Sequence, residues 1–223
     1  MSRPPPPRPA LSTQRVIDAA SRVADASGLA GVSMRSVGRE LEVEAMSLYH
    51  HVASKDALLD GLADWVFERI ETPSPSGPWR AEMEGRAHSA RTVLAAHPWG
   101  LGLIESRRSP GPATLHHHDA VLGCLRAAGF TVALAGHAFS VLDAYVYGFV
   151  LTEVNLPFQP GESAEDFVAD LGPLMSAYPH LAEMVAEQIV GRDYAYGNEF
   201  AYGLELVLDG LEERFGTGLR GGG

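Results

Sequence analysis

The segment from Val32 to Lys55 constrains the fold of this chain more than any other part of the sequence. Ser33 is a favourable N-cap, because its hydroxyl can accept hydrogen bonds from the free amides of a first helical turn. Val37 and Leu41 stand four residues apart, so they share one face of a helix over about 34–41. The segment therefore begins with one short amphipathic helix.

A second short helix is predicted over about 45–52, after an interruption at residues 42–44. Leu48 and Val52 again stand four residues apart and are expected to face inward. The outer face then carries small, hydroxyl and aromatic side chains: Ala45, Met46, Ser47, Tyr49 and His50, with His51 at its end. Such a face suits a helix in a DNA major groove, although a plain helical hairpin with these side chains on its surface is the alternative.

The second helix and the residues after it resemble the DNA-reading segment of the tetracycline-repressor (TetR) family. A hydroxyl residue precedes Leu-Tyr, a histidine follows the Tyr by two positions, and a lysine opens the next helix: Ser47, Leu48, Tyr49, His51 and Lys55. The resemblance implies DNA contacts from nine residues: Ser33, Arg35, Ala45, Met46, Ser47, Tyr49, His50, His51 and Lys55.

Two positions depart from the family pattern. Glu42 stands where a turn glycine is usual, so left-handed backbone there would cost about 1 kcal/mol. Gly38 stands where a small alanine is usual and weakens the first of the two helices slightly.

Length and composition indicate a cytoplasmic protein. The 223 residues suffice for one compact unit, or for a small domain and a larger one. No apolar run reaches the roughly 18 residues that a membrane span needs, and residues 1–9 lack the apolar core of a signal peptide. The single cysteine, Cys124, excludes an internal disulfide and a zinc site built on several thiolates.

The net charge of −11 is unevenly distributed along the chain. Residues 1–56 carry seven basic and six acidic side chains, whereas residues 57–223 carry ten and 22. Because phosphate binding is local, an acidic remainder does not exclude a DNA-binding N-terminal part.

Helical periodicity and proline placement predict four regions. These are a disordered Pro-rich arm at 1–10, a helix-turn-helix domain with its connecting helix at 11–72, a ligand-binding and dimerisation domain at 73–215, and a flexible tail at 216–223. Helices are expected over about 13–27, 34–41, 45–52, 55–71, 79–96, 101–105, 114–128, 131–155, 164–171, 181–190 and 198–215. Because no alternating strand pattern is present, the expected fold is all-α: an N-terminal three-helix DNA-binding domain and a larger C-terminal helical domain.

No constellation of residues indicates catalysis, a metal or another cofactor. Consecutive residues 116–118 are all histidine, but neighbours on a helix point about 100° apart and cannot chelate one ion together. No HExxH spacing, phosphate-binding glycine loop or nucleophile elbow appears.

The C-terminal helix carries an apolar stripe: Phe200, Leu204, Val207, Leu208, Leu211 and Phe215. A stripe of this kind could close the core of its own domain. The run from Tyr202 to Glu212, however, resembles the final helix of TetR-family proteins. That resemblance implies that this stripe and the helix over 114–128 form a homodimer interface, in which Gly203 and Gly210 allow close approach.

The resemblance also implies a small-molecule site in the middle of the chain. In members that respond to tetracycline, one histidine grips the drug and another holds its magnesium; aligned with them are Glu71 and Glu105. Tetracycline–magnesium binding is therefore expected to be lost. The expected pocket is lined by Glu71, Arg86, Ala90, Glu105, Pro110, Val121, Phe139, Asp143 and Tyr147, unless these charges pair with one another or face solvent. Its acidic groups would favour an apolar or aromatic ligand with a cationic or donor-rich edge.

The sequence thus predicts a ligand-responsive transcriptional regulator, a repressor released from a palindromic double-stranded DNA operator by a small-molecule effector. One alternative is a protein-binding adaptor of the same fold that lacks DNA binding, which the acidic charge would suit. The other is an all-α enzyme, for which no competent cluster is found. Tyr49, His51 and Lys55 favour DNA over the adaptor.

Overall fold

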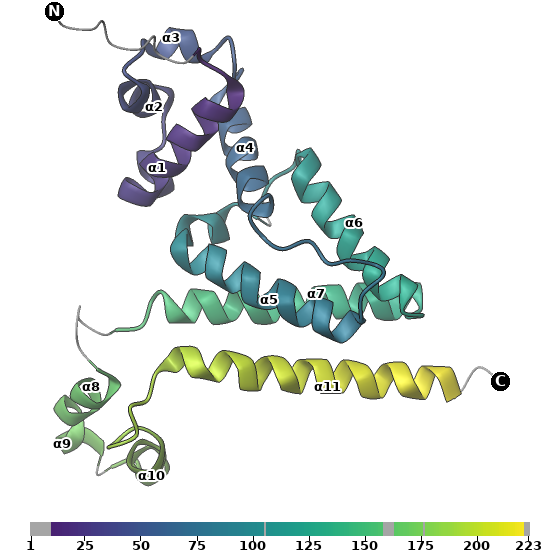
Figure 1. Ribbon diagram of the computed structural model, residues 1–223. Helices are drawn as coiled ribbons and strands as arrows, with labels where there is room; N and C mark the ends of the chain where they lie inside the picture. The colour runs from purple at the N-terminus through teal and green to yellow at the C-terminus, as the bar shows by residue number, and fades with distance from the viewer. Residues whose placement is uncertain (1–9, 105, 158–162, 176, 221–223) are drawn as a thin grey trace, which may run out of the picture. The chain divides into compact units, whose positions relative to one another are not determined.

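The computed structural model describes residues 10–104, 106–157, 163–175 and 177–220, and within these ranges the chain is helical and without strands (Figure 1). The elements are α1 (Thr13–Gly31), α2 (Met34–Leu41), α3 (Ala45–Leu48), α4 (Lys55–Phe67), α5 (Trp79–Ala96), η1 (Pro98–Gly102), α6 (Pro112–Ala127), α7 (Val132–Glu153), α8 (Ala164–Asp170), α9 (Gly172–Met175), α10 (Pro179–Gln188), η2 (Tyr196–Asn198) and α11 (Glu199–Arg220). The all-α prediction is confirmed.

Two compact units divide the chain, residues 1–129 and residues 130–223. This division differs from the boundary expected near residue 72. Helices α1 and α4 contact η1, and α4 packs on α6, so the N-terminal helices and the segment up to residue 129 form one unit.

The N-terminal helices are stabilised by the caps that the sequence predicts. The Ser33 hydroxyl accepts from the amide of Ser36 at 3.1 Å, and the Ser36 hydroxyl accepts in return from the amide of Ser33 at 2.9 Å. This reciprocal capping box satisfies two amides at the start of α2. Gly28 has φ +64 and kinks α1, which continues for one further turn to Gly31 instead of ending there.

Helix α4 is four residues shorter than expected, because its hydrogen-bonding pattern changes after Phe67. The amides of Arg69 and Ile70 donate to the carbonyls three residues earlier, at 3.1 and 3.3 Å, which tightens the chain into turns. The sequence stripe continued to Ile70, which is buried, but its backbone is no longer α-helical.

The rest of the first unit follows the expected helices closely. Helix α5 has the predicted bounds, whereas the short helix after it begins at Pro98 and not near residue 101. Proline suits the first turn of a helix, where its missing amide would have no intrahelical partner. For the same reason α6 begins at Pro112.

In the second unit, α7 packs along α11. Tyr145 donates from its hydroxyl to the carbonyl of Phe200 at 2.8 Å, and the rings of Phe130 and Phe215 stack at 4.4 Å. Helix α7 is long and apolar enough to cross a membrane by length and composition alone, which the sequence reading did not anticipate. Core helices of soluble proteins pass the same test, and α7, whose apolar window is 39% buried, packs against α11 within its unit.

The apolar stripe of α11 differs from its predicted role. Four of its side chains are buried within the single chain: Phe200, Leu204, Leu208 and Leu211, with Val207 half-buried. The stripe therefore closes the core of its own unit, the alternative noted above. The exposed apolar side chains of α11 are instead Tyr202 and Leu206. The helix also continues to Arg220, through part of the segment expected to be a flexible tail.

Candidate DNA-binding surface and effector site

Helix α3 presents the predicted DNA-reading residues on its outer face. Leu48 and Val52 are buried, whereas Met46 is 74% exposed and Tyr49 46% exposed. His50 and Lys55 are exposed as well. The predicted inward and outward faces of the second helix are thus both found in the structure, although regular helix ends at Leu48.

The remaining predicted DNA contacts divide into two groups. Arg35 is exposed on α2, whereas the hydroxyl of Ser33 is engaged in the capping box. Ala45, Ser47 and His51 are half-buried. The carbonyl of His51 accepts from the hydroxyl of Thr13 at 3.1 Å, which ties the end of the second helical segment to α1.

Both departures from the family pattern lie at or against the turn between α2 and α3. Glu42 adopts the left-handed conformation, with φ 55 and ψ 43, at the position where glycine was expected. A Cβ atom at Gly38 would lie 2.9 Å from the carbonyl oxygen of Val43 and 3.3 Å from the Cα of Ala45. Gly38 therefore permits close packing of α2 against the start of α3.

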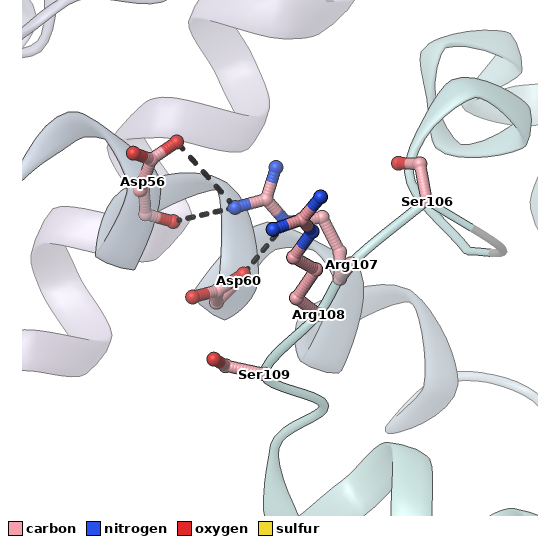
Figure 2. A pocket seen from close by; sticks show the side chains of 6 residues that line it. All are labelled: Asp56, Asp60, Ser106, Arg107, Arg108 and Ser109. Atoms are coloured by element: carbon pink, nitrogen blue, oxygen red, sulfur yellow. Dashed lines mark hydrogen bonds and ion pairs between the residues drawn. The ribbon is translucent and has the colours of Figure 1, made fainter.

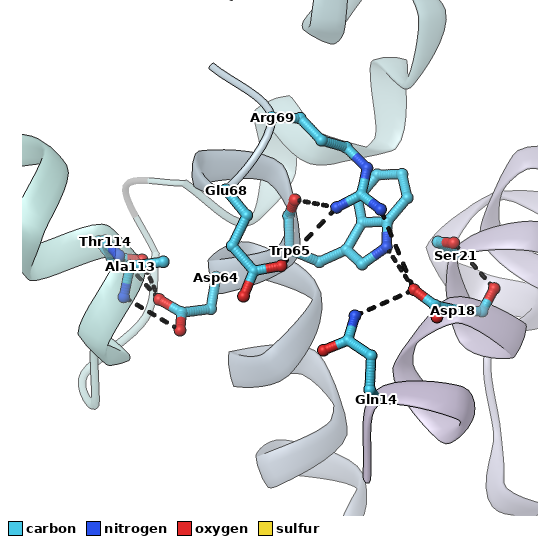
Figure 3. Close-up of polar contacts among 9 residues, drawn as sticks. All are labelled: Gln14, Asp18, Ser21, Asp64, Trp65, Glu68, Arg69, Ala113 and Thr114. Atoms are coloured by element: carbon cyan, nitrogen blue, oxygen red, sulfur yellow. Dashed lines mark hydrogen bonds and ion pairs between the residues drawn. The ribbon is translucent and has the colours of Figure 1, made fainter. Parts of the chain in front are cut away.

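A polar network connects α1 to α4 (Figure 3). The carboxylate of Asp18 accepts from the indole nitrogen of Trp65 at 3.0 Å and from the side-chain amide of Gln14 at 3.1 Å. The guanidinium of Arg69 lies 3.3 Å from the centre of the Trp65 ring, a cation–π distance. The orientation of α1 is thereby linked to the second half of α4.

A second carboxylate connects α1 to η1. Asp25 accepts from the indole nitrogen of Trp99 at 2.6 Å, and its Oδ1 lies 2.7 Å from Nδ1 of His97. The rings of His97 and Trp65 meet edge to face at 4.9 Å. Helix α1 is thus attached at two points, to α4 through Asp18 and to η1 through Asp25.

The opposite side of α4 carries two further attachments. In Figure 2, Arg107 donates from Nε to Asp60 at 2.6 Å and from Nη2 to the carbonyl of Asp56 at 3.2 Å, beside a surface pocket of about 330 Å³. One turn further along, Asp64 accepts from the amide and the hydroxyl of Thr114, at 2.7 and 3.0 Å (Figure 3). A carboxylate is favourable at this N-terminus of α6, where the free amides carry partial positive charge.

A buried polar pair lies among α4, α5 and α6. Arg86 donates from Nε to Nε2 of His117 at 2.9 Å, and each residue is 1% exposed. Burial lowers the pKa of His117 from 6.5 to about 3, with smaller contributions from Arg86, His118 and His116. His117 is therefore neutral at physiological pH. Its ring centre lies 5.3 Å from that of Phe67, the last residue of α4.

The other predicted pocket residues are found in different settings. Ala90 and Val121 are buried, but Pro110 and Glu71 are exposed, and Glu105 lies outside the described residues. The backbone amide of Glu71 donates to the hydroxyl of Ser89 at 2.9 Å. For the Glu71 carboxylate the structure thus shows the second alternative, a charge that faces solvent.

Three predicted pocket residues belong to α7 and hence to the second unit: Phe139, Asp143 and Tyr147. Asp143 is buried, and the two aromatic residues are half-buried. In the part of the chain that the structure describes, no three His, Cys, Asp or Glu side chains gather in a geometry that could hold a metal ion.

Sequence reasoning singled out Arg86 but missed His117, Asp18, Asp25 and Asp64. The last three are exposed or half-buried acidic residues, and no pattern in the neighbouring sequence indicates their long-range hydrogen bonds. His117 belongs to the histidine triplet, and a clue was available in the helical spacing. It stands four residues before the buried Val121, on the inner face of α6.

Comparison with known proteins places the whole chain in one family. Residues 16–62 match the family model for bacterial regulatory proteins of the tetR family, and residues 72–215 match the tetracyclin repressor-like C-terminal domain. The transcriptional repressor DrrR1 of Streptomyces coeruleorubidus is 34% identical over 217 residues, which cover 92% of this chain and 79% of the relative. The class A tetracycline repressor from transposon 1721 in Escherichia coli is 31% identical over 208 residues, which cover 92% of each protein.

The solved structures that resemble the chain include ActR from Streptomyces coelicolor. Its apo form superposes with a TM-score of 0.77 at 26% identity and covers 95% of this chain and all of the ActR chain. A complex of ActR with actinorhodin gives a TM-score of 0.75 at 28% identity, covering 93% of this chain and all of the ActR chain. Matched along nearly its entire length in both sequence and fold, the chain belongs to the TetR family of DNA-binding transcriptional regulators.

Proposed function

We propose that this regulator is a homodimeric repressor that leaves a palindromic operator when a small molecule binds. The exposed face of α3 carries the proposal, because Met46 and Tyr49 are large apolar side chains held out from the fold beside Lys55. Side chains of this size contribute little to the stability of their own unit when they are exposed to water. A groove of DNA, by contrast, offers thymine methyl groups and phosphates to such residues.

The DNA contacts that we propose are of two kinds. Lys55 and the hydroxyl groups of Ser47 and Tyr49 bind phosphate, which fixes position without reading sequence. Arg35 and Met46 lie on α2 and α3 with exposed side chains and contact bases. In a dimer, two such surfaces are about 34 Å apart when they occupy successive major grooves of one DNA face.

Helix α4 is the element through which an effector acts in this proposal. Its first half is bound to Arg107, its middle to the start of α6, and its last residues to α1 and to the ring of His117. A ligand that alters the packing of α5 and α6 changes the contacts at the end of α4. Coupling arises only if the ligand binds the two arrangements with different affinity.

Relatives support a small-molecule effector and a repressing role. ActR has been solved in complex with actinorhodin, and DrrR1 and the class A tetracycline repressor are repressors by name. By analogy with these regulators, this protein acts in the cytoplasm and not as an enzyme. Its partners are operator DNA, an effector and a second copy of the chain.

The decisive experiment is selection of genomic fragments by the purified full-length protein, followed by affinity measurements at several salt concentrations. Lys55→Ala should weaken all selected fragments alike and reduce the salt slope by about one. Arg214→Ala is the matched control, because it removes one exposed positive charge from α11 in the other unit. If the unmodified protein shows no salt-dependent binding to any fragment, the proposal fails and a protein-binding adaptor of this fold takes its place.

A further inference from the structure

The hydrogen bond between Arg86 and His117 determines which nitrogen of His117 carries its proton. A guanidinium N–H can only donate, so Nε2 of His117 must accept the bond of 2.9 Å. A neutral imidazole has one N–H group, and that group must then be at Nδ1. His117 therefore presents a donor on the side of the ring opposite Arg86.

That donor is buried without a hydrogen-bond acceptor. Within the described part of the chain, Nδ1 of His117 has no partner, although the side chain is 1% exposed. A buried donor left unsatisfied costs about 1–3 kcal/mol, and a native structure that retains one generally uses it. An acceptor atom brought by a ligand would recover this free energy on binding.

The surroundings of His117 indicate what kind of molecule can bring the acceptor. The ring of Phe67 lies 5.3 Å from that of His117 and meets the ring of His118 edge to face at 5.1 Å. Val121, one turn further along α6, is buried. Aromatic and apolar side chains thus lie near the ring that carries the donor, and such surroundings favour a planar aromatic ligand.

The unsatisfied donor of His117 favours an acceptor on the ligand over a cationic group. The Nδ1–H group of His117 is a donor, and the carboxylate of Glu71, which was expected to attract a cation, is exposed. The edge of the ligand that enters here is therefore rich in acceptors.

We propose that the effector carries a carbonyl oxygen on a planar aromatic body, and that this oxygen accepts a hydrogen bond from Nδ1–H of His117. The inference rests on the proposed function and specifies the effector class of that same regulator. Arg86 acts as a positioning residue, because its own hydrogen bond fixes the tautomer that donates. Phe67, whose ring lies 5.3 Å from that of His117, is the last residue of α4, so binding of the ligand affects the helix that connects to α1.

The first test examines the tautomer in the full-length protein without ligand. Nitrogen-15 NMR of histidine side chains distinguishes a protonated Nδ1 from a protonated Nε2, and His117→Gln identifies the signal by its loss. The expected result is the Nδ1–H tautomer for His117 at pH 7.5. Protonation at Nε2 instead would overturn the inference, because Nδ1 would then have no proton to donate.

The second test uses a matched pair of probes, 9-fluorenone and fluorene, which share a planar tricyclic body and differ by the carbonyl group. The unmodified protein should bind 9-fluorenone about fivefold to tenfold more tightly than fluorene, the worth of one net hydrogen bond. Intrinsic fluorescence and thermal shift both report the binding. Equal affinities, or no binding of 9-fluorenone at millimolar concentration, contradict the proposal.

Two substitutions at His117 separate the donor from the structural bond to Arg86. Glutamine places an amide oxygen near Nε2 and removes the donor at Nδ1, whereas asparagine places an amide N–H near Nδ1. The preference for 9-fluorenone should disappear in His117→Gln and persist in His117→Asn. A preference that survives in His117→Gln refutes the role of Nδ1–H.

Operator binding, measured on the same preparations, distinguishes failure of this inference from failure of the proposed function. If all variants bind the selected fragments but show no carbonyl preference, the effector class is wrong and the DNA-binding function stands. If the unmodified protein selects no fragment, the proposed function is wrong whichever probe binds.

Discussion

Acidification should destabilise this protein through His117 before most carboxylates are protonated. In the folded chain, burial first and the neighbouring Arg86 second lower the pKa of His117 from 6.5 to about 3. The unfolded chain takes up a proton below pH 6.5, whereas the folded chain resists it until about pH 3. The contribution of His117 to stability is therefore complete above pH 6.5 and is lost as the pH falls from 6.5 toward 3.

The size of the effect follows from the same two pKa values. At 1.36 kcal/mol for each pKa unit, the full difference corresponds to about 5 kcal/mol once both states are protonated. At pH 5.0 the unfolded state is almost fully protonated at this residue and the folded state is not. The free energy of unfolding should then be lower by about 2 kcal/mol than at pH 7.5 on account of His117 alone.

Urea denaturation at pH 7.5 and 5.0 measures this loss. One protein concentration is used throughout, because the stability of the proposed dimer depends on it. His117→Gln cannot titrate and should lose about 2 kcal/mol less than the unmodified protein between the two pH values. His180→Gln is the control, since the side chain of His180 is 97% exposed, and it should behave like the unmodified protein. Equal losses for His117→Gln and the unmodified protein would show that His117 titrates normally in the fold.

Local structure was largely predictable from the sequence, because its causes lie within a few residues. Ser33 caps the helix that follows it, and the bounds of α5 are those that its periodicity predicts. The four-residue spacing of Leu48 and Val52 identified the buried side of the DNA-reading segment. Capping and face assignment depend on neighbours along the chain, which a sequence displays directly.

The contacts that join these helices were not predictable in the same way. Asp18 meets a tryptophan 47 positions away, and Asp25 meets another 74 positions away. No periodicity relates residues at such separations, and an exposed aspartate on an amphipathic helix usually faces water. The attachment of α1 to the rest of its unit therefore appears only in three dimensions.

The apolar stripe on α11 could likewise be recognised in the sequence, but the surface that it packs against could not. An apolar stripe shows that one face of a helix will be buried, but it does not show which surface buries it. Here α7 is apolar on several faces and packs along that stripe within the same chain. The sequence of the histidine triplet likewise did not show which of the three side chains would be buried. His116 is exposed, His118 is half-buried and, of these three, His117 is buried.

Three further substitutions test the contacts that position α4, α6, α11 and α1. Asp64→Ala removes the acceptor at the N-terminus of α6, so urea denaturation should show a loss of about 1–2 kcal/mol; an unchanged midpoint would contradict the capping role. Leu208→Ala should lower the free energy of unfolding by about 2–5 kcal/mol through a core cavity, while the exposed Leu206→Ala should have little effect. The last substitution, Asp25→Ala, removes Oδ1, the oxygen that accepts from the indole N–H of Trp99 and lies 2.7 Å from Nδ1 of His97. Because that carboxylate connects α1 to η1, amide hydrogen exchange in the second half of α1 should become faster while exchange in α11 stays the same. If exchange in α1 is unchanged, packing alone holds the helix, and Asp25 has no part in fixing the orientation of the DNA-binding surface.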